Sequence, residues 1–207
     1  MPTKSSDKQA KKHNKENIKI FGLIVYKNDF QYLNTAIKSL YNFCDQILII
    51  DNDSSDYFNT TPYKKLICRR KSGTLIECLN YGIKIIREIE PKSYIFRLDA
   101  DEIFIKSKIN INHLKKFIFD NNVKAFSIER DIYYKNKPIS NDLKQDVIRL
   151  FSCHLEYENS LIMDEFINSN CVNIKFLKIL DLRNSSISEH FERHLIYANR
   201  ECENYFK

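Results

Sequence analysis

The sequence has few glycines, no paired-cysteine motif and no long apolar run, and each absence excludes a class of protein. Only three glycines occur in 207 residues, namely Gly22, Gly73 and Gly82, whereas the dinucleotide-binding fingerprint and the P-loop need several at fixed spacing. No apolar run approaches the length of about 18 residues that suggests a membrane-spanning helix, and the polar N-terminus lacks the apolar core of a signal peptide. We therefore expect a cytoplasmic protein that binds any phosphate through a metal, basic side chains or helix N-termini.

The cysteines are scattered along the chain, and none is in a Cys-x-x-Cys motif. Several of them lie within apolar patterns, so we expect reduced, buried thiols. The six are Cys44, Cys68, Cys78, Cys153, Cys171 and Cys202.

The net charge of +6 is unevenly distributed. Residues 1–17 carry five lysines and two acids without apolar periodicity, and we expect this basic tail to be disordered. Residues 18–207 then form one mildly basic domain, which suits an anionic substrate and leaves peripheral contact with an anionic membrane open. No compact Lys/Arg cluster interleaved with aromatic residues is present, so we expect no nucleic-acid partner.

Short apolar runs alternate with amphipathic segments in the first half of the domain. Strands are predicted at 18–25, 46–50, 64–68 and 94–98, with helices at 30–44 and 75–86 where apolar residues recur at steps of three and four. This β-α-β-β-α-β order predicts an α/β domain with a largely parallel central sheet flanked by helices. The pattern is weaker beyond residue 104, with a helix at 114–118, strands at 126–134 and 147–151, an ambiguous segment at 172–182 and a helix at 191–206.

The stretch around Asp99 is the main candidate for a functional site. An apolar run leads directly into Asp99, Asp101 and Glu102. Extended side chains repeat every second residue, so we expect Asp99 and Asp101 to point the same way and to repel each other. A divalent cation would relieve that repulsion. A solvated acidic turn is the commoner explanation of an isolated Asp-x-Asp, but open α/β sheets place ligands where strands end.

Several motifs together resemble family 2 glycosyltransferases. They are a strand, helix and second strand running into Asp51-Asn52-Asp53-Ser54-Ser55-Asp56, then Asn80-Tyr81-Gly82, and Leu98-Asp99-Ala100-Asp101-Glu102. The resemblance covers residues 18–104 well and reaches weakly through Arg149-Leu150-Phe151, Met163-Asp164-Glu165 and Glu189-His190. It implies a GT-A fold, with residues 18–104 binding a nucleotide-diphospho-sugar and residues 105–207 forming the acceptor side.

The resemblance also implies a donor site. Asp51 and Asn52 would contact the base or ribose, with Asp53 beside them. Independently of the resemblance, the basic cluster Arg69-Arg70-Lys71 follows the third predicted strand, so we expect Arg70 and Lys71 near the phosphates. We expect Asp51 and Asn52 to lie within a few ångströms of Asp99, because parallel strands end at one edge of the sheet.

The implied chemistry is metal-dependent transfer with inversion. Asp99 and Asp101 would hold Mn²⁺ or Mg²⁺ and the ribose, and His190 is a candidate further ligand. Inversion needs a carboxylate that accepts the proton of the attacking hydroxyl. The candidate bases are Glu165, Asp164 and, more weakly, Glu102.

The expected function is therefore a glycosyltransferase of bacterial surface glycan synthesis, acting on a glycan or lipid-linked glycan. Two alternatives stay open. A nucleotidyltransferase also uses acids at strand ends with Mg²⁺, although a glycine-rich phosphate loop near the first strand is missing. A non-catalytic nucleotide-binding domain is the other alternative, because the acceptor half is short.

Overall fold

The computed structural model describes residues 18–28, 30–55, 58, 63–106, 110–134, 137–138, 144–158, 167, 169–183, 195, 198 and 202. Within them lie the strands β1 (Ile20–Tyr26), β2 (Gln46–Asp51), β3 (Leu66–Arg70), β4 (Tyr94–Asp99), β5 (Glu102–Lys106), β6 (Ala125–Tyr134), β7 (Lys137–Pro138), β8 (Gln145–Ser152) and β9 (Cys171–Arg183). The helices there are α2 (Phe30–Tyr41), α3 (Leu75–Ile89) and α4 (Ile111–Asn121).

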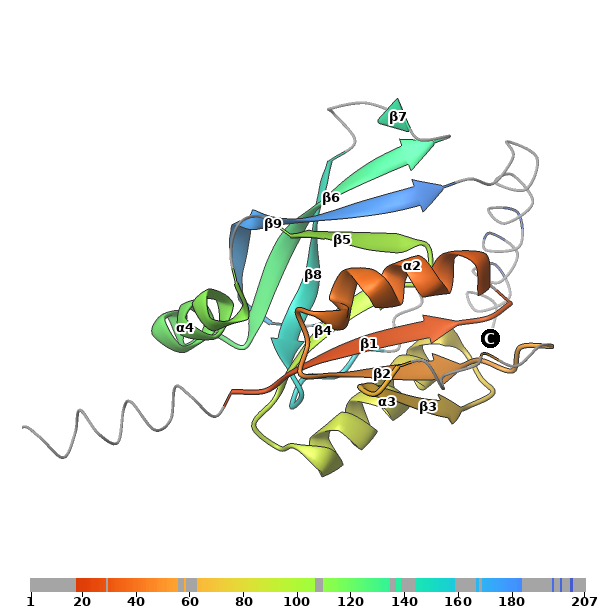
Figure 1. Ribbon diagram of the computed structural model, residues 1–207, viewed down its shortest axis with the longest axis horizontal. Coiled ribbons are helices and arrows are strands. Elements are labelled where there is room, and N and C mark those ends of the chain that lie inside the picture. The colour runs from red at the N-terminus through yellow and green to blue at the C-terminus, as the bar shows by residue number, and fades with distance from the viewer. Residues whose placement is uncertain are drawn as a thin grey trace, which may run out of the picture.

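The first four strands form a parallel sheet in the order β3-β2-β1-β4. The arrows of β1, β2 and β3 point to the same side of the molecule (Figure 1). Their parallel direction agrees with the predicted β-α-β-β-α-β pattern, because the helical crossovers α2 and α3 each return the chain so that the following strand runs in the same direction. The α/β prediction is confirmed for this half of the chain.

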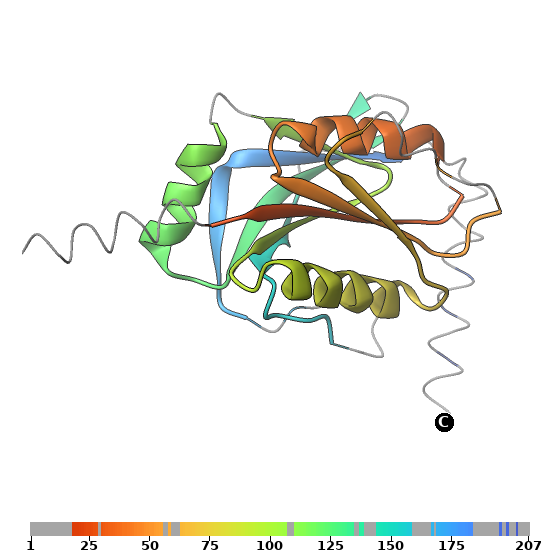
Figure 2. The same ribbon diagram turned by 60° about the horizontal axis from the view of Figure 1, so that its bottom comes forward.

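Helices cover both faces of this sheet, with α2 and α3 on opposite sides of the strands (Figure 2). Buried residues of α2 recur at steps of three and four, and those of α3 do the same. Helix α3 approaches the sheet closely at Gly82, where a Cβ atom would come within 2.6 Å of Leu23 Cδ1. A side chain at this position would therefore force the helix or Leu23 to move.

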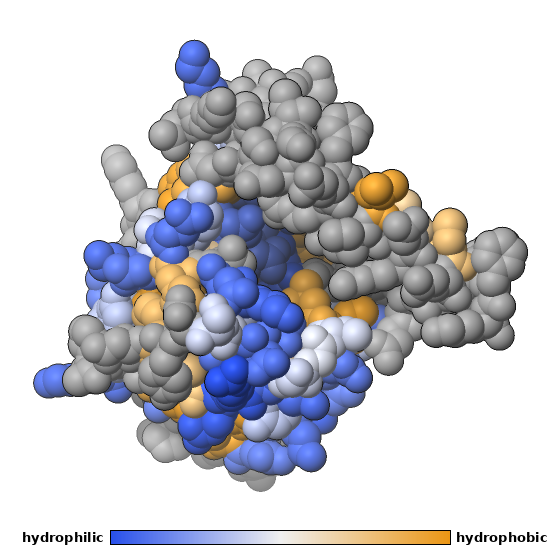
Figure 3. Space-filling view, turned by 90° about the vertical axis from the view of Figure 1, so that its right-hand side faces the viewer, coloured by the Kyte–Doolittle hydropathy of each residue, from blue (hydrophilic) through white to orange (hydrophobic). Residues whose placement is uncertain are grey.

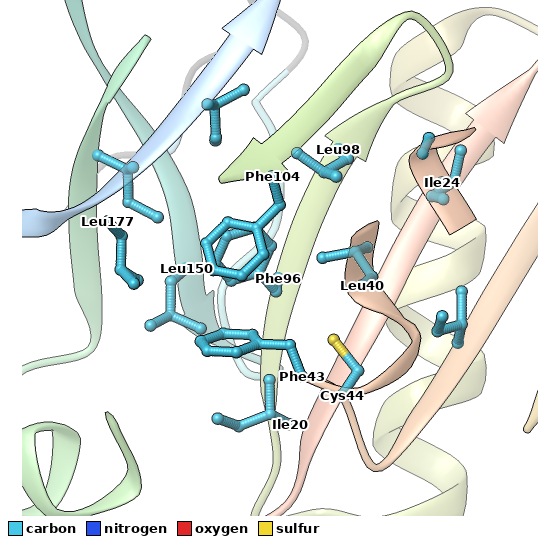
Figure 4. Close-up of a cluster of buried hydrophobic side chains, with 14 of the residues drawn as sticks. Ile20, Ile24, Leu40, Phe43, Cys44, Phe96, Leu98, Phe104, Leu150 and Leu177 are labelled. Atoms are coloured by element: carbon cyan, nitrogen blue, oxygen red, sulfur yellow. The ribbon is translucent and has the colours of Figure 1, made fainter. Parts of the chain in front are cut away.

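Beyond β4 the sheet becomes mixed, in the order β4-β8-β6-β9-β5. Strand β8 is antiparallel to β4, and β5 is antiparallel to β9. Strand β5 follows β4 directly in the chain but is placed at the far end of the sheet. Phe104 of β5 packs against Phe96 of β4 and Phe43, with ring centroids 5.0 and 4.4 Å apart, and this aromatic cluster joins β5 to the parallel sheet (Figure 4).

The second half departs most from the sequence prediction. Strand β5 was not predicted, because its short run follows the acids that were expected to end the strand pattern. The ambiguous segment 172–182 is strand β9. In the first half, the third strand ends at Arg70 rather than at residue 68. The basic tail and most of the predicted terminal helix lie outside the described residues.

All six cysteines are free thiols. Cys44, Cys78 and Cys153 are buried as expected, whereas Cys171 and Cys202 are exposed, so the prediction of buried thiols is wrong for these two. None of the helices in the described part of the chain is long and apolar enough to cross a bilayer.

Candidate nucleotide-sugar site

Two of the predicted acidic positions lie at the same edge of the sheet. Asp51 ends β2 and pairs with Tyr26, and Asp99 ends β4 and pairs with Val25, so the two acids flank the end of β1. Hydrophilic residues gather in the middle of this face, which Figure 3 views from the side to which the parallel strands point. The topology therefore brings the two acidic motifs together at the edge where open α/β sheets bind ligands.

The two acids are nevertheless farther apart than we expected. Two interstrand spacings separate Asp51 from Asp99, which places their Cα atoms about 10 Å apart. Side chains alternate along each strand, so Asp51 lies on the face covered by α2, like Ile49, whereas Asp99 lies on the face covered by α3, like Ile95. The predicted separation of a few ångströms is therefore wrong for Asp51, because one edge of a sheet has two faces, and for Asn52 it stays a prediction.

Asp51 organises the turn that follows β2. Its side chain is only 2% exposed, and Oδ1 accepts a hydrogen bond of 2.8 Å from the backbone N–H of Ser54. The neighbouring loop is bonded to this turn, since the N–H of Ser55 donates to Asn28 Oδ1 at 2.9 Å and that of Asn28 donates to Ser54 Oγ at 3.0 Å. Asp51 therefore fixes the loops that would meet a donor, and its carboxylate is shielded from solvent.

The other residues predicted for the donor site bond to one another and to nearby backbone. Arg70 Nη2 donates to Asp53 Oδ1 at 2.6 Å and to the carbonyl of Ser54 at 3.1 Å. Asn52 Oδ1 accepts from the N–H of Gly73 at 3.2 Å, and the N–H of Lys71 donates to the carbonyl of Asp51 at 2.9 Å. Asp53 and the guanidinium of Arg70 are both exposed, so an incoming phosphate would compete with Asp53 for Arg70.

The N-terminus of α3 opens on the same edge but is already capped. Thr74 Oγ1 accepts from the N–H of Glu77 at 3.2 Å, and Glu77 Oε2 accepts from the N–H of Thr74 at 2.7 Å. This reciprocal capping box satisfies amide groups that an anion would otherwise use. A phosphate at this edge would therefore depend on basic side chains or a metal rather than on the helix end.

Asp99 is held by two buried arginines. Arg97 Nη2 donates to Oδ1 at 2.5 Å, and Arg149 Nη2 donates to Oδ2 at 2.7 Å. Burial raises the pKa of Asp99, but the charges of Arg149 and Arg97 outweigh burial and hold that pKa well below its ordinary value. Asp99 is therefore an ionised carboxylate with both oxygens engaged.

Glu102 closes the turn between β4 and β5. It is 1% exposed, and Oε2 accepts from the N–H of Asp99 at 2.9 Å. Its other oxygen accepts from Arg149 at 2.6 Å and from Arg130 at 3.3 Å. A buried carboxylate with both oxygens occupied is poorly placed to accept a proton from a substrate hydroxyl, so this contact set argues against Glu102 as the base.

Asp101 behaves differently from Asp99. Burial, followed by the charges of Asp99, Asp181 and Glu102, raises the pKa of Asp101 to about 7. A divalent cation beside Asp101 would relieve this repulsion, so the carboxyl group fits a metal ligand. The described residues contain no group of three or more His, Cys, Asp or Glu side chains arranged as a metal site, which is compatible with Mg²⁺, since that ion uses one or two carboxylates with water and substrate phosphates.

Several residues of this site were not singled out from the sequence. Arg97 was not noted, and Arg149 was noted only as part of a motif. Both interrupt apolar strands, and a charged residue within a buried strand is the signal that could have identified them. Asn80 was noted only as part of a motif. Its side chain donates to the carbonyl of Tyr157 and accepts from the N–H of Tyr157, both at 2.9 Å, and the ring of Tyr157 lies 5.4 Å from the Arg97 guanidinium.

Three predicted residues, Glu165, Asp164 and His190, lie outside the described part of the chain. Their roles as base and metal ligand stay predictions.

No family model and no curated protein matches the sequence. Among solved structures, S. aureus TarS (residues 1–349) is similar with a TM-score of 0.51 and 12% identity, covering 88% of this chain and 65% of the TarS chain. The 2-C-methyl-D-erythritol 4-phosphate cytidylyltransferase of Francisella tularensis gives a TM-score of 0.45 and 16% identity, covering 88% of this chain and 99% of that one.

The similarity to TarS and the topology of the sheet together show the fold. The chain has the α/β fold of GT-A nucleotide-sugar transferases. It spans just under two thirds of the TarS chain.

Proposed function

We propose that the protein is a metal-dependent glycosyltransferase that moves a sugar from a nucleotide-diphospho-sugar to a hydroxyl group, as in the family 2 enzymes that its motifs resemble. The observation that carries the proposal is the position of the Asp99-Ala100-Asp101 turn. It lies at the carboxyl end of β4, beside the end of β1, in a sheet of GT-A type. Ligands of open α/β sheets bind at this edge.

In this proposal Asp101 holds Mn²⁺ or Mg²⁺, and His190 is a further candidate ligand. When bound, the ion acts as a Lewis acid that neutralises charge developing on the leaving nucleoside diphosphate. The positive charges of Arg97 and Arg149 at the two oxygens of Asp99 disfavour a divalent cation there, so we assign Asp99 to the ribose instead. A carboxylate offers about four lone-pair positions, and the two arginines use two of them.

The donor would lie across the ends of β1 and β2. Because Asp51 is buried, we propose that it shapes the turn and that Asn52, which is only half-buried, makes the contact with base or ribose. Arg70 and Lys71 would approach the diphosphate, with Arg70 exchanging its bond to Asp53 for one to phosphate. Charge-assisted bonds from arginine to phosphate oxygens favour such an exchange.

The proton of the acceptor hydroxyl would go to Glu165, with Asp164 as the alternative. Inversion in a single displacement requires such a base on the face of the sugar opposite the leaving diphosphate. A glycan or lipid-linked glycan acceptor, a place in bacterial surface glycan synthesis and peripheral contact with the inner face of a membrane complete the proposal. They depend on the sequence resemblance and on the basic charge.

A nucleotidyltransferase is the competing enzyme class on this fold. The connection from β1 to α2 consists of residues 27–29 and contains no glycine, so a glycine-rich loop that cradles a triphosphate is missing there. This short connection favours sugar transfer over nucleotidyl transfer.

Two assays test the proposal. The first is a thermal-shift panel of UDP, GDP, CMP and their sugars with and without Mn²⁺. The second measures metal-dependent hydrolysis of any sugar nucleotide that binds. We expect hydrolysis to be lost in excess chelator and in Asp101→Asn, but kept in Asp120→Asn, which removes an exposed carboxylate of α4. Hydrolysis that continues in excess chelator would overturn the metal proposal. Release of pyrophosphate from a nucleoside triphosphate would favour the nucleotidyltransferase. Binding of a nucleotide sugar without turnover would favour a non-catalytic domain.

A further inference from the structure

Two buried arginines face each other beside the acidic turn. Strands β4 and β8 are antiparallel with Phe96 opposite Leu150, so continuing this register by one residue places Arg97 opposite Arg149. Both side chains are only 3% exposed. Like charges directly opposite in a sheet repel, and a buried guanidinium is costly unless it is paired. The arrangement therefore requires acids in fixed positions between the two cations.

The acids are Asp99 and Glu102. Arg97 contacts one oxygen of Asp99, and Arg149 contacts the other oxygen through the same nitrogen that donates to Glu102. The N–H of Asp99 also donates to Glu102. Asp99 is thus held at both carboxylate oxygens and at its backbone.

Stability alone does not account for this cluster. A buried ion pair is often no more stabilising than well-packed apolar residues of similar volume, and the neighbouring positions on the same face, Ile95 and Phe151, are apolar. The members also differ in exposure. Glu102 and both arginines are at most 3% exposed, whereas the Asp99 side chain is 32% exposed. The cluster therefore presents one carboxylate to solvent in a fixed orientation at the edge of the sheet.

We propose that Arg97 and Arg149 are positioning residues, which hold Asp99 as a preorganised acceptor for a hydroxyl group of the donor nucleotide. The inference rests on the proposed function, since it assumes that a nucleotide sugar binds at this edge. Fixing a polar group before the ligand arrives lowers the conformational cost of binding. Because Arg149 belongs to β8, the acceptor-side half of the chain would complete the donor site.

The test is a double-mutant cycle on nucleotide affinity. Isothermal titration with Mn²⁺ and the best nucleotide of the UDP, GDP and CMP panel is performed on the full chain, on Arg149→Lys and Arg97→Lys, and on each of these in the Asp99→Asn background. Lysine keeps the charge but lacks the planar fork of arginine. We expect each single lysine variant to bind at least about tenfold more weakly, by analogy with the loss that follows when a residue that orients a metal ligand is changed.

In the Asp99→Asn background the same lysine changes should have less than about a twofold effect, because additivity fails for residues that act through one another. A merely structural role would instead weaken binding equally in both backgrounds. Arg87→Lys is the matched control. The Arg87 guanidinium donates to the carboxylate of Glu156 at 2.7 Å and to the carbonyl of Cys153 at 2.8 Å, away from the acidic turn.

The outcomes separate the inference from the function. If the wild-type chain binds none of the nucleotides, the proposed function is overturned and the inference with it. If the wild type binds and the lysine variants bind equally well, or lose the same affinity with and without Asp99, only the inference is overturned. If one lysine variant does not fold, the other decides, because each arginine contacts a different oxygen of Asp99.

Discussion

Asp101→Asn should stabilise the metal-free protein at pH 8 although it removes a charged group. The pKa of Asp101 is raised from 3.8 to about 7 by burial and by the carboxylates of Asp99, Asp181 and Glu102. Between these two pH values the folded protein binds more protons than the unfolded chain, so stability falls as pH rises. Asparagine resembles the neutral carboxyl group and cannot ionise, so Asp101→Asn does not lose this stability as the pH rises.

The magnitude follows from linkage. About three pKa units at ~1.4 kcal/mol each give an upper limit of about 4 kcal/mol at pH 8. About two of these three pKa units are passed between pH 5 and pH 7, so only that part of the stability change falls within the measured range. Relaxation of the fold and solvent around the partly accessible carboxyl group reduce the stability change further. We therefore expect the stability advantage of Asp101→Asn to grow by ~1–2 kcal/mol between pH 5 and pH 8.

Urea unfolding in excess chelator at both pH values measures this difference. Asp120→Asn is the control, since its carboxylate is exposed on α4 and should change stability by less than about 0.5 kcal/mol at either pH. Adding Mn²⁺ with a bound nucleotide should remove the advantage, because a cation stabilises the ionised wild-type carboxylate. An advantage for Asp101→Asn that is absent at pH 8, or equal at the two pH values, would refute the repulsion inferred at this turn.

Three further predictions concern the core, a helix cap and the base. Phe104→Ala should lower the free energy of unfolding by ~3–5 kcal/mol, because it removes the central ring of the aromatic cluster that joins β5 to the parallel sheet; a loss below 1 kcal/mol in urea unfolding would contradict that packing. Thr74→Ala should cost about 1 kcal/mol and Thr74→Ser much less, since only the hydroxyl caps α3; equal losses would argue against the cap. Glu165→Gln should reduce turnover at least ~100-fold while donor affinity is kept, with Asp164→Asn milder; the reverse order would assign the base to Asp164.

Local patterns in the sequence were sufficient for the first half of the fold. Apolar residues at steps of three and four mark the buried faces of α2 and α3, and short apolar runs mark the buried strands β1, β2 and β4. The alternation of these strands and helices predicts a parallel sheet. The placement of Asp51 and Asp99 at one edge follows from the same rule. Each of these features depends on residues close together in the chain.

The features that only the tertiary structure determines depend on contacts between residues far apart in the chain. Strand β5 lies beside β9, which begins 65 residues after β5 ends, and no local pattern encodes such a partner. The face on which each acid lies depends on the register of its strand, where one residue reverses the orientation of the side chain. Asp99 meets Arg149 across 50 residues of sequence, so the sequence identified the acid of the motif, and only the folded sheet showed which cations hold it.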